Sequence, residues 1–555
     1  GEREEASRQF LATRDLYLMK QIESADALYW IGVAGRRHGM RTEEESRTDA
    51  LSLVTEHILP EALDADPAHY EAAHEMGSIW IDAFDAPYAK QNYAEALEKN
   101  PRHPDLLAGM ASTMLLKFGT RTQATGHLTK ALAVNPNHSE SLRLLAAVKL
   151  HDEEYQEVKE LIDRALAVNP RDLEALSLLA GYHRLRAETN AYEEVESQVL
   201  RLNPRYGNFY HIVAASILTK RQFHDAVDLL QKAVDLDPRH WHAYIELGTN
   251  LMRIGVGGEE IARPILEKAM KEFPYHVQSK NMLTLLETYD EYIIKEHGDI
   301  HVRLHISEDP LMRPYIERFL DECIPYLEER YEVQIDGPIL FEIFHDHADF
   351  GVRSIGLTGL GALGVCFGQV VTMDGPAARQ GQFNWKSTAW HEFAHVFTLQ
   401  KSRYRIPRWF TEGLSGLEEK RENPAWLREK NLELYSAWSA GRMRGIMDLN
   451  AGFTRPRYGS EVIVCYYQAA LVCEYIEEVH GWAKVLAMLD GYADRSTTSD
   501  VIEEILGLSI EEFDAGFERY LVDHYFGEMK VMPSFTGEDI EDLRDRIDID
   551  PSDSE

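Results

Sequence analysis

The pattern of apolar and polar positions in the second half of the chain predicts a small sheet accompanied by helices. Segments with the β-branched and aromatic residues of strands occupy residues 301–306, 338–344 and 365–373. Apolar residues at helical spacing predict helices at residues 311–331, 384–401, 425–440, 460–479, 482–489 and 510–525, with a further helix after Pro407. A small sheet followed by packed helices predicts an α+β domain over residues 299–530.

The first half has a different pattern, in which a proline returns at a nearly constant interval. An Asp or Asn precedes the first six prolines and a Phe precedes the last: Pro67, Pro101, Pro136, Pro170, Pro204, Pro238 and Pro274. The intervals are 34, 35, 34, 34, 34 and 36 residues. Proline cannot continue a preceding helix, so each one marks the end of a unit.

A small residue stands five positions before each proline, with one valine as the exception: Ala62, Ala96, Ala131, Ala165, Val199, Ala233 and Ala269. This pattern resembles the tetratricopeptide repeat. The resemblance implies two antiparallel helices per repeat, which cross closely at the small residue. Gly77 and Leu247-Gly248 would lie in the close-packed turn of the first helix of their repeats. Stacked repeats form a solenoid, so residues 1–298 are expected to hold about seven repeats and a capping helix over residues 276–296.

Two roles remain open for the solenoid. In the family that it resembles, such repeats bind peptides and proteins, so the groove is expected to recruit a substrate or a protein partner. Alternatively, the solenoid is a structural arm whose groove is empty or filled by its own chain.

The most informative chemical motif is His391-Glu392-Phe393-Ala394-His395. Residues four apart share one face of a helix, so both imidazoles can point at one ion. Zinc prefers about four tetrahedral ligands, and a catalytic site leaves one of them to water. Glu392 then lies beside that water as a general base. The motif predicts a zinc-dependent hydrolase.

A third ligand is expected at Glu412, 17 positions after His395. The first helix extends about six residues past His395, which is ~9 Å at ~1.5 Å per residue. Residues 402–406 can turn, and Pro407 suits the first turn of a returning helix. The second helix would bring Glu412 back to the level of the metal, and Gly413 and Gly416 would leave room between the two helices.

At these residues the chain resembles the gluzincin, or peptidase MA-like, metallopeptidases. Their signature is His-Glu-x-x-His followed by a glutamate in an aromatic-x-x-Glu-Gly context, here Trp409-Phe410-Thr411-Glu412-Gly413. The resemblance covers about residues 299–526. It implies a zincin-type fold with zinc bound by His391, His395 and Glu412. No Gly-x-Met-Glu-Asn element is present, so an endopeptidase or an atypical hydrolase is favoured over an aminopeptidase.

Peptide hydrolysis also requires a group that stabilises the oxyanion opposite the metal. In gluzincins this group is often a tyrosine or histidine, and a Tyr-x-Gln-small pattern indicates Tyr466. Tyr467 and, with less support, Tyr458 remain alternatives, as does a core role for all three.

Residues 365–373 are also candidates for an edge strand beside which a peptide substrate lies antiparallel. The glycine-rich segment 351–364 before it is a candidate flap over the cleft. A core strand and a passive connection are equally compatible with the sequence. By residue type alone, two further groups could bind metal: His345-Asp346-His347-Ala348-Asp349, and the pair His301 and His305. Neither group is assigned a function.

Net charge and composition limit the classes of molecule that the protein is expected to bind. The formal net charge of −35 over 555 residues disfavours nucleic acid and anionic membranes and modestly favours basic or neutral peptides. The four cysteines have no Cys-x-x-Cys spacing, so no structural zinc site is expected. No apolar run reaches the ~18 residues of a membrane span. The compartment is undetermined, and because the chain begins with Gly1, removal of an export signal stays open.

The sequence therefore predicts a zinc-dependent peptidase with a mainly α fold, in which an α-solenoid precedes an α+β metallopeptidase domain. The acidic residues 531–555 are expected to be a tail or the start of another repeat. Two alternatives remain: a non-catalytic repeat scaffold that retains the zincin fold, and a hydrolase acting on a non-peptide amide or ester.

Overall fold

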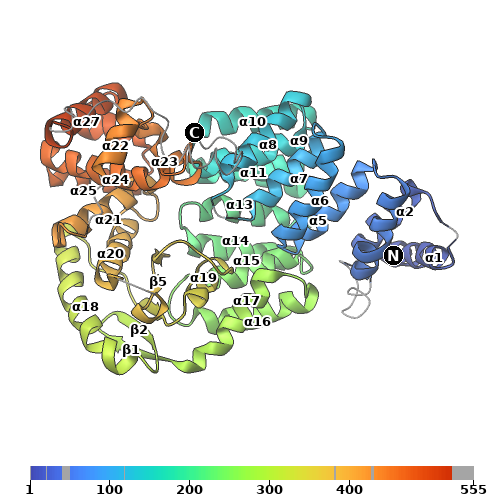
Figure 1. The fold of residues 1–555 in the computed structure, drawn as a ribbon, viewed down its shortest axis with the longest axis horizontal. Helices are drawn as coiled ribbons and strands as arrows, with labels where there is room; N and C mark the ends of the chain where they lie inside the picture. The colour runs from blue at the N-terminus through green and yellow to red at the C-terminus, as the bar shows by residue number, and fades with distance from the viewer. Residues whose placement is uncertain are drawn as a thin grey trace, which may run out of the picture.

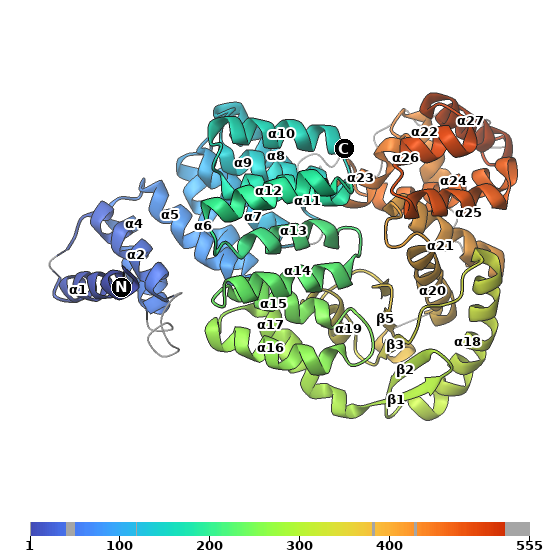
Figure 2. The same cartoon turned by 180° about the vertical axis from the view of Figure 1, so that it is seen from behind.

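The computed structural model describes residues 2–20, 22–39, 50–117, 119–379, 383–426 and 430–527. The predicted tail at residues 531–555 lies outside these ranges. Figure 1 shows a stack of helices, coloured blue to green, whose later members curve back toward a second unit coloured yellow to red. Figure 2 shows the same two units from behind, with the later helices of the stack facing the sheet and the helices of the second unit.

Within the described residues, the solenoid contains six regular antiparallel helix pairs, one in each proline-spaced repeat. These pairs are α5 (Tyr70–Asp82) with α6 (Ala86–Lys99), α7 (Pro104–Leu115) with α8 (Arg121–Val134), α9 (Ser139–His151) with α10 (Tyr155–Val168), α11 (Leu173–Leu185) with α12 (Thr189–Leu202), α13 (Asn208–Leu218) with α14 (Phe223–Leu236), and α15 (Trp241–Leu251) with α16 (Gly258–Glu272). This arrangement confirms the tetratricopeptide-type helical region.

Both ends of the array are less regular. At the start lie α1 (Glu2–Leu18), α2 (Ala25–Gly39), the π-helical turn η1 (Val54–Ile58) and α4 (Leu59–Ala65). At the other end α17 (Val277–Thr288) follows the last proline. The predicted capping helix over residues 276–296 is therefore too long, because α17 ends at Thr288 and a strand begins at Tyr292 after the short 3-10 turn η2 (Tyr289–Glu291).

The small residues occupy the buried positions that the repeat pattern predicts. All seven positions are at most 6% exposed: Ala62, Ala96, Ala131, Ala165, Val199, Ala233 and Ala269. A Cβ placed on Gly77 would lie 2.4 Å from the ring of Tyr93, and one on Gly248 would lie 2.6 Å from Leu266. Small residues therefore permit the close crossing of each helix pair.

The Asp or Asn before each proline has a separate local role. Its side chain accepts a hydrogen bond from the backbone N–H two residues later, as Asn135 does from Asn137 and Asn169 does from Arg171. The same turn forms at Asp66, Asn100, Asn203 and Asp237. These side chains close the connection between repeats, which explains why Asp-Pro and Asn-Pro recur.

The second unit begins with a five-stranded mixed sheet of strand order β1-β2-β3-β5-β4. The strands are β1 (Tyr292–His297), β2 (Ile300–His305), β3 (Ile339–Phe344), β4 (Gly364–Cys366) and β5 (Val370–Asp374). β1 pairs antiparallel with β2 through a hairpin at Gly298, whose φ is +58°. The sheet thus starts at Tyr292, before the expected boundary at residue 299, because Ile293 and Ile294 pair with β2 instead of continuing α17.

The helices of this unit are α18 (Asp309–Tyr331), α19 (His347–Ile355), α20 (Trp385–Lys401), α21 (Arg408–Glu422), α22 (Asn431–Ser439), α23 (Leu449–Thr454), α24 (Glu461–Tyr475), α25 (Trp482–Ala493), α26 (Thr498–Asp500) and α27 (Ile510–His524). Most follow the predicted segments within a few residues. Within the described ranges, no helix combines the length and apolar character needed to cross a bilayer.

Two predictions for the segment before the metal motif need correction. Residues 365–373 form two strands, because Gly368, with a φ of +96°, turns the chain between β4 and β5. The expected flap over residues 351–364 is helical in its first part, since α19 extends to Ile355. α19 buries Phe350, Val352 and Arg353, so it belongs to the core beside α17.

Polar contacts join the solenoid to the second unit at two places. At α23, Arg455 pairs with Asp152 and Glu154, and Thr122 Oγ1 donates to the Pro456 carbonyl at 2.9 Å. Near the sheet, Arg353 Nη2 donates to the Met252 carbonyl at 2.7 Å. Turns inside the repeats therefore face α19 and the end of α23.

Candidate metal centre

The motif lies on two antiparallel helices. Asn384 caps α20 by accepting a hydrogen bond from the Ser387 N–H at 3.2 Å, and Pro407 is the N-cap of α21. Between them Arg403 and Tyr404 have φ values of +50° and +59°, which turn the chain sharply. The short connection brings α21 back along α20, as the spacing predicts.

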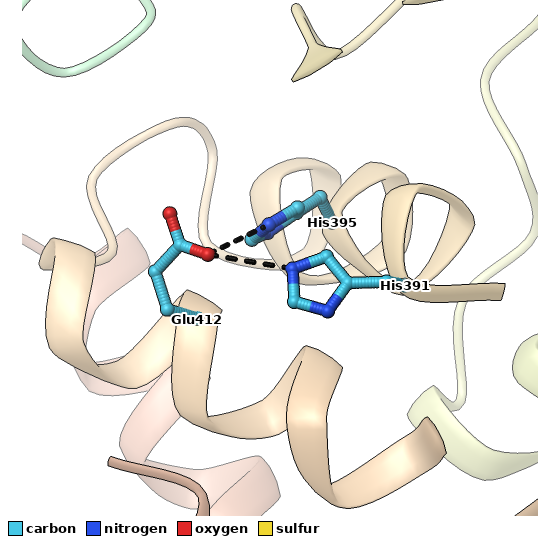
Figure 3. A group of neighbouring side chains, drawn as sticks. All are labelled: His391, His395 and Glu412. Atoms are coloured by element: carbon cyan, nitrogen blue, oxygen red, sulfur yellow. Dashed lines mark hydrogen bonds and ion pairs between the residues drawn. The ribbon is translucent and has the colours of Figure 1, made fainter. Parts of the chain in front are cut away.

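The three proposed ligands converge on one point. Figure 3 shows both imidazoles on α20 directed toward the carboxylate of Glu412 on α21. Glu412 Oε2 lies 3.4 Å from His391 Nε2 and 3.3 Å from His395 Nε2. One ligand atom from each of the three residues lies within 4.8 Å of the others.

This spacing fits a zinc ion. With Zn–N and Zn–O bonds of about 2.0–2.1 Å and tetrahedral angles, ligand atoms lie about 3.3–3.4 Å apart. The two distances from Glu412 match that value. Two imidazoles and one carboxylate also form a donor set that leaves a fourth position free, which is typical of catalytic zinc.

Partners on the far side of each imidazole hold its orientation. His391 Nδ1 lies 2.6 Å from Glu419 Oε1, and His395 Nδ1 lies 2.7 Å from Thr411 Oγ1. Thr411 also contacts Thr398 Oγ1 at 2.8 Å. When Nδ1 carries the proton, Nε2 presents its lone pair to a metal. The sequence analysis missed Glu419 and Thr411. Glu419 lies seven residues, about two helical turns, after Glu412 and therefore on the same face of α21.

The electrostatics of the three ligands reflect their mutual contact. Burial opposes charge on His391, but hydrogen bonds to Glu412 and Glu419 hold its pKa well above the ordinary value. Burial lowers the pKa of His395 to about 4. For Glu412 burial is outweighed by the two histidines and Arg408, so its pKa lies well below the ordinary range.

Glu392 follows His391 on α20 and lies against Gly364 of the edge strand, where His391 and Glu412 act electrostatically on its carboxyl group. A Cβ on Gly364 of β4 would lie 2.7 Å from Glu392 Cγ. The glutamate is 6% exposed, and burial raises its pKa to about 7. A carboxyl group with a pKa near neutrality can both accept and return a proton.

The structure separates the three tyrosine candidates. Tyr466 Oη lies 3.3 Å from Arg408 Nη2, and its pKa is raised by burial and by Glu412. Tyr467 is buried and donates a hydrogen bond to Asn431 Oδ1 on α22 at 2.5 Å. Tyr458 packs under the Arg442 guanidinium, 4.7 Å from its ring centre. Tyr466 is therefore the candidate beside the ligands.

Two arginines at the site were not predicted from the sequence. Arg408 Nε lies 3.4 Å from Glu412 Oε1, one helical turn before it. Arg221 Nη2 lies 3.8 Å from the same oxygen and comes from the turn between α13 and α14 of the solenoid. No local signal marks Arg221, because 191 positions separate it from Glu412 in the sequence.

Gly413 has a different role from the expected one. A Cβ at this position would lie 2.4 Å from the Ala469 carbonyl oxygen and 2.6 Å from Cys473 Sγ. Both belong to α24, so Gly413 allows α24 rather than α20 to approach α21 closely.

The other histidine groups do not form comparable sites. His305 stacks on His345 with ring centres 4.6 Å apart, and His347 Nδ1 pairs with Asp374 at 3.0 Å. A second group within the described residues brings together Asp105, His138 and Glu140. There His138 Nε2 lies 2.7 Å from Asp105, and Nδ1 accepts from the Ser141 N–H, so both ring nitrogens are engaged.

Comparisons with known proteins concern the repeats. A TPR protein from Parabacteroides merdae is 18% identical, with a TM-score of 0.31, over 45% of this chain and 98% of its own. YrrB, described as a TPR protein with an unusual peptide-binding site, is 17% identical, with a TM-score of 0.23, over 33% of this chain and 95% of its own. No family model and no curated protein matches the chain.

Proposed function

We propose that the chain is a zinc-dependent peptidase whose repeat solenoid forms part of the active-site wall. The observation that carries the proposal is the convergence of His391, His395 and Glu412, in which Glu412 Oε2 lies at tetrahedral spacing from both imidazoles. Glu392 is close enough for His391 and Glu412 to influence its pKa. The mixed sheet and the helix pair after it also agree with the zincin-type architecture that the motif implies.

His391, His395 and Glu412 would hold the ion, and Glu419 and Thr411 would orient the two imidazoles. A bound zinc ion supplies Lewis acidity, which makes water more acidic and polarises a substrate carbonyl. The remaining steps are performed by side chains of this chain.

Glu392 accepts the proton of the attacking water and then returns it to the departing amine. Its position beneath β4 suits this role, because a peptide paired with the edge strand would place its scissile bond over the carboxylate. Burial excludes competing solvent from Glu392.

Tyr466 donates a hydrogen bond from Oη to the oxygen that becomes negatively charged when the carbonyl is attacked. Arg408 holds the phenol in place through its 3.3 Å contact with Oη. Arg408 and Arg221 also place positive charge near Glu412. Endopeptidase action is favoured, since the described site has no element recognised as a free-amine anchor.

The test is Glu392→Gln, measured with a proteome-derived peptide mixture and mass-spectrometric identification of the products. The variant should retain about one metal ion per chain and its Tm, and lose about 10²- to 10⁴-fold in turnover. Glu329→Gln, an exposed position on α18, is the matched control and should cleave like the parent.

Cleavage by Glu392→Gln at the parent rate would refute the mechanism. If the parent cleaves no peptide while binding zinc, the non-catalytic scaffold is the better description. Products that arise only from non-peptide amides or esters would instead support the alternative hydrolase.

A further inference from the structure

A cavity of about 230 Å³ lies between the solenoid and the second unit, beside the candidate metal centre. We call it the cationic cavity and define it by its charged and imidazole lining residues: Arg221, His224, Asp225, Arg253, Arg403 and Arg405. The first four come from the solenoid, and the last two come from the turn between α20 and α21. Phe223, Phe367 and Tyr404 add apolar surface to its lining.

The balance of charge in this cavity is opposite to that of the whole chain. Four arginines face one carboxylate, whereas the chain has a formal net charge of −35. The carboxylate, Asp225, already pairs with Arg184 at 3.1 Å. Positive charge concentrated against that background attracts an anion.

Three of the four arginines lack an ion-pair partner within the described residues. Among the ion pairs of the described residues, Arg253, Arg403 and Arg405 pair with no carboxylate, and Arg405 Nη1 donates to the Ala493 carbonyl at 3.1 Å. Arg253 Nη1 and Nη2 donate to Asn250 and to the Ser354 carbonyl, while its Nε is buried without a partner. Burial, together with repulsion from Arg495 and Arg403, lowers the pKa of Arg405.

Arg221 connects the cavity to the metal centre. It lines the cavity, and its Nη2 also lies 3.8 Å from Glu412 Oε1. A ligand in the cavity would therefore extend toward the atoms that react. Guanidinium groups recognise carboxylates through paired hydrogen bonds, which makes a carboxylate a suitable occupant.

The edge strand sets the direction of such a ligand. Gly364 of β4 lies against Glu392, and the cavity begins three residues further along the chain, at Phe367 and Gln369. At about 3.3 Å per residue this displacement is roughly 10 Å. A peptide antiparallel to β4 has its amino-terminal side toward Phe367, so the cavity is level with a residue about three positions before the scissile bond.

We propose that the cationic cavity binds an acidic side chain of the peptide substrate on the amino-terminal side of the scissile bond, and that Arg221 and Arg405 determine this preference. The inference rests on the proposed peptidase function. It makes the solenoid a direct contributor to specificity, because one of the two arginines belongs to a repeat.

The first experiment measures binding without turnover. Two fluorescein-labelled hexapeptides, identical except for Glu or Gln in their amino-terminal half, are titrated by anisotropy into the full-length Glu392→Gln protein after chelator treatment. The Glu peptide should bind about tenfold more tightly than the Gln peptide, since one charge-assisted hydrogen-bonded pair contributes about that factor.

The variants localise the preference. In the same background, Arg221→Gln and Arg405→Gln should each bring the affinity ratio of the two peptides close to one. Arg405→Gln should also leave the affinity for the Gln peptide nearly unchanged. Because Arg405 does not contact a proposed metal ligand, the Arg405→Gln variant tests the cavity without a direct effect on Glu412. Arg318→Gln is the control for charge alone, since Arg318 is exposed on α18, and it should keep the ratio of the parent.

A second experiment addresses the source of the anion and the proposed function separately. Peptides that the parent cleaves are resynthesised with Glu or Gln at each of the four positions before the scissile bond, and inorganic phosphate is titrated as a free anion. A preference for Glu near the third position, lost in Arg405→Gln, supports the proposal.

Equal binding and cleavage of the Glu and Gln peptides would overturn the cavity assignment and leave the peptidase function intact. Tight phosphate binding together with equal peptide binding would show a free-anion site, which also contradicts the proposal. Absence of cleavage in the parent would refute the peptidase function, and the binding ratio would still decide the cavity.

Discussion

Two helix pairs of this chain differ in the side chains that they bury. In the repeat formed by α9 and α10, the crossing buries Leu142, Ala146, Ile162 and Ala165. In the pair formed by α20 and α21, the facing surfaces bury charged and polar groups that include His395 and Glu412, 2% and 4% exposed. The first pair contributes stability through apolar burial, whereas the second holds charges out of water.

The difference in buried side chains suggests a structural role for the α9–α10 pair and a chemical role for the α20–α21 pair. Burying an ion pair costs desolvation that its attraction only partly offsets, so apolar residues would stabilise α20 and α21 at least as well. The proposed metal site would give the three ligand atoms a chemical use that packing does not require. The solenoid, in contrast, buries mainly apolar residues where its helices cross, and many of its polar side chains form turns and caps.

The largest effect is expected from His395→Ala. Loss of one of three protein ligands should reduce zinc from about one ion per chain to nearly none and abolish cleavage, as determined by elemental mass spectrometry and peptide turnover. His138→Ala is the matched control, because that histidine belongs to the other cluster of potential ligands. Zinc retained at the parent level in His395→Ala would contradict the assignment.

A smaller effect is expected from Glu419→Gln, which weakens the acceptor for His391 Nδ1. Zinc affinity, measured by chelator competition, should fall about 10- to 100-fold while the fold is kept. Glu422→Gln removes a carboxylate three residues later on α21, where Glu422 pairs with Lys386 at the surface. Equal zinc affinities in the two variants would show that Glu419 does not support zinc binding.

The solenoid should respond to changes in packing instead. Ala165 is 0% exposed at the crossing of α9 and α10, so Ala165→Leu should lower the free energy of unfolding by about 1–3 kcal/mol. Zinc content at 25 °C should not change. Ala167→Leu, on the exposed side of the same helix, should leave the Tm within about 1 °C of the parent.

Acid should destabilise the solenoid through its neutral histidines. Burial lowers the pKa values of His151 and His211 to about 4, although Asp152 favours the charged form of His151. The unfolded histidine titrates near 6.5, so between pH 6.5 and 4 the unfolded state binds more protons. The free energy of unfolding should therefore decrease as the pH is lowered below about 6.5. Above that pH, these two histidines should not affect it.

Thermal unfolding at pH 7 and pH 5 measures this effect, and a decrease in Tm of about 5 °C is expected. His211→Gln, which cannot be protonated, should show a smaller decrease. The same slope in the parent and the variant would show that His211 does not contribute.

Sequence patterns could predict features that arise from short spacings. The 34-residue proline interval located the repeats, and the four-residue spacing of His391 and His395 placed them on one helix face. β1 was missed because Tyr292-Ile293-Ile294 extends an apolar helical pattern, and only pairing with β2 makes it a strand. Glu419 and Thr411 were missed because a hydrogen-bond partner needs only to be near in space.

The sequence by itself determined the helix pairs and the shared helix face of His391 and His395, because these depend on residues at short, regular spacings. Only the tertiary structure decided that Tyr466 rather than Tyr467 lies beside the ligands, and that α24 packs at Gly413. It alone brought Arg221 to Glu412 and formed the cationic cavity. Such contacts follow from how the solenoid packs against the second unit, and no local propensity encodes them.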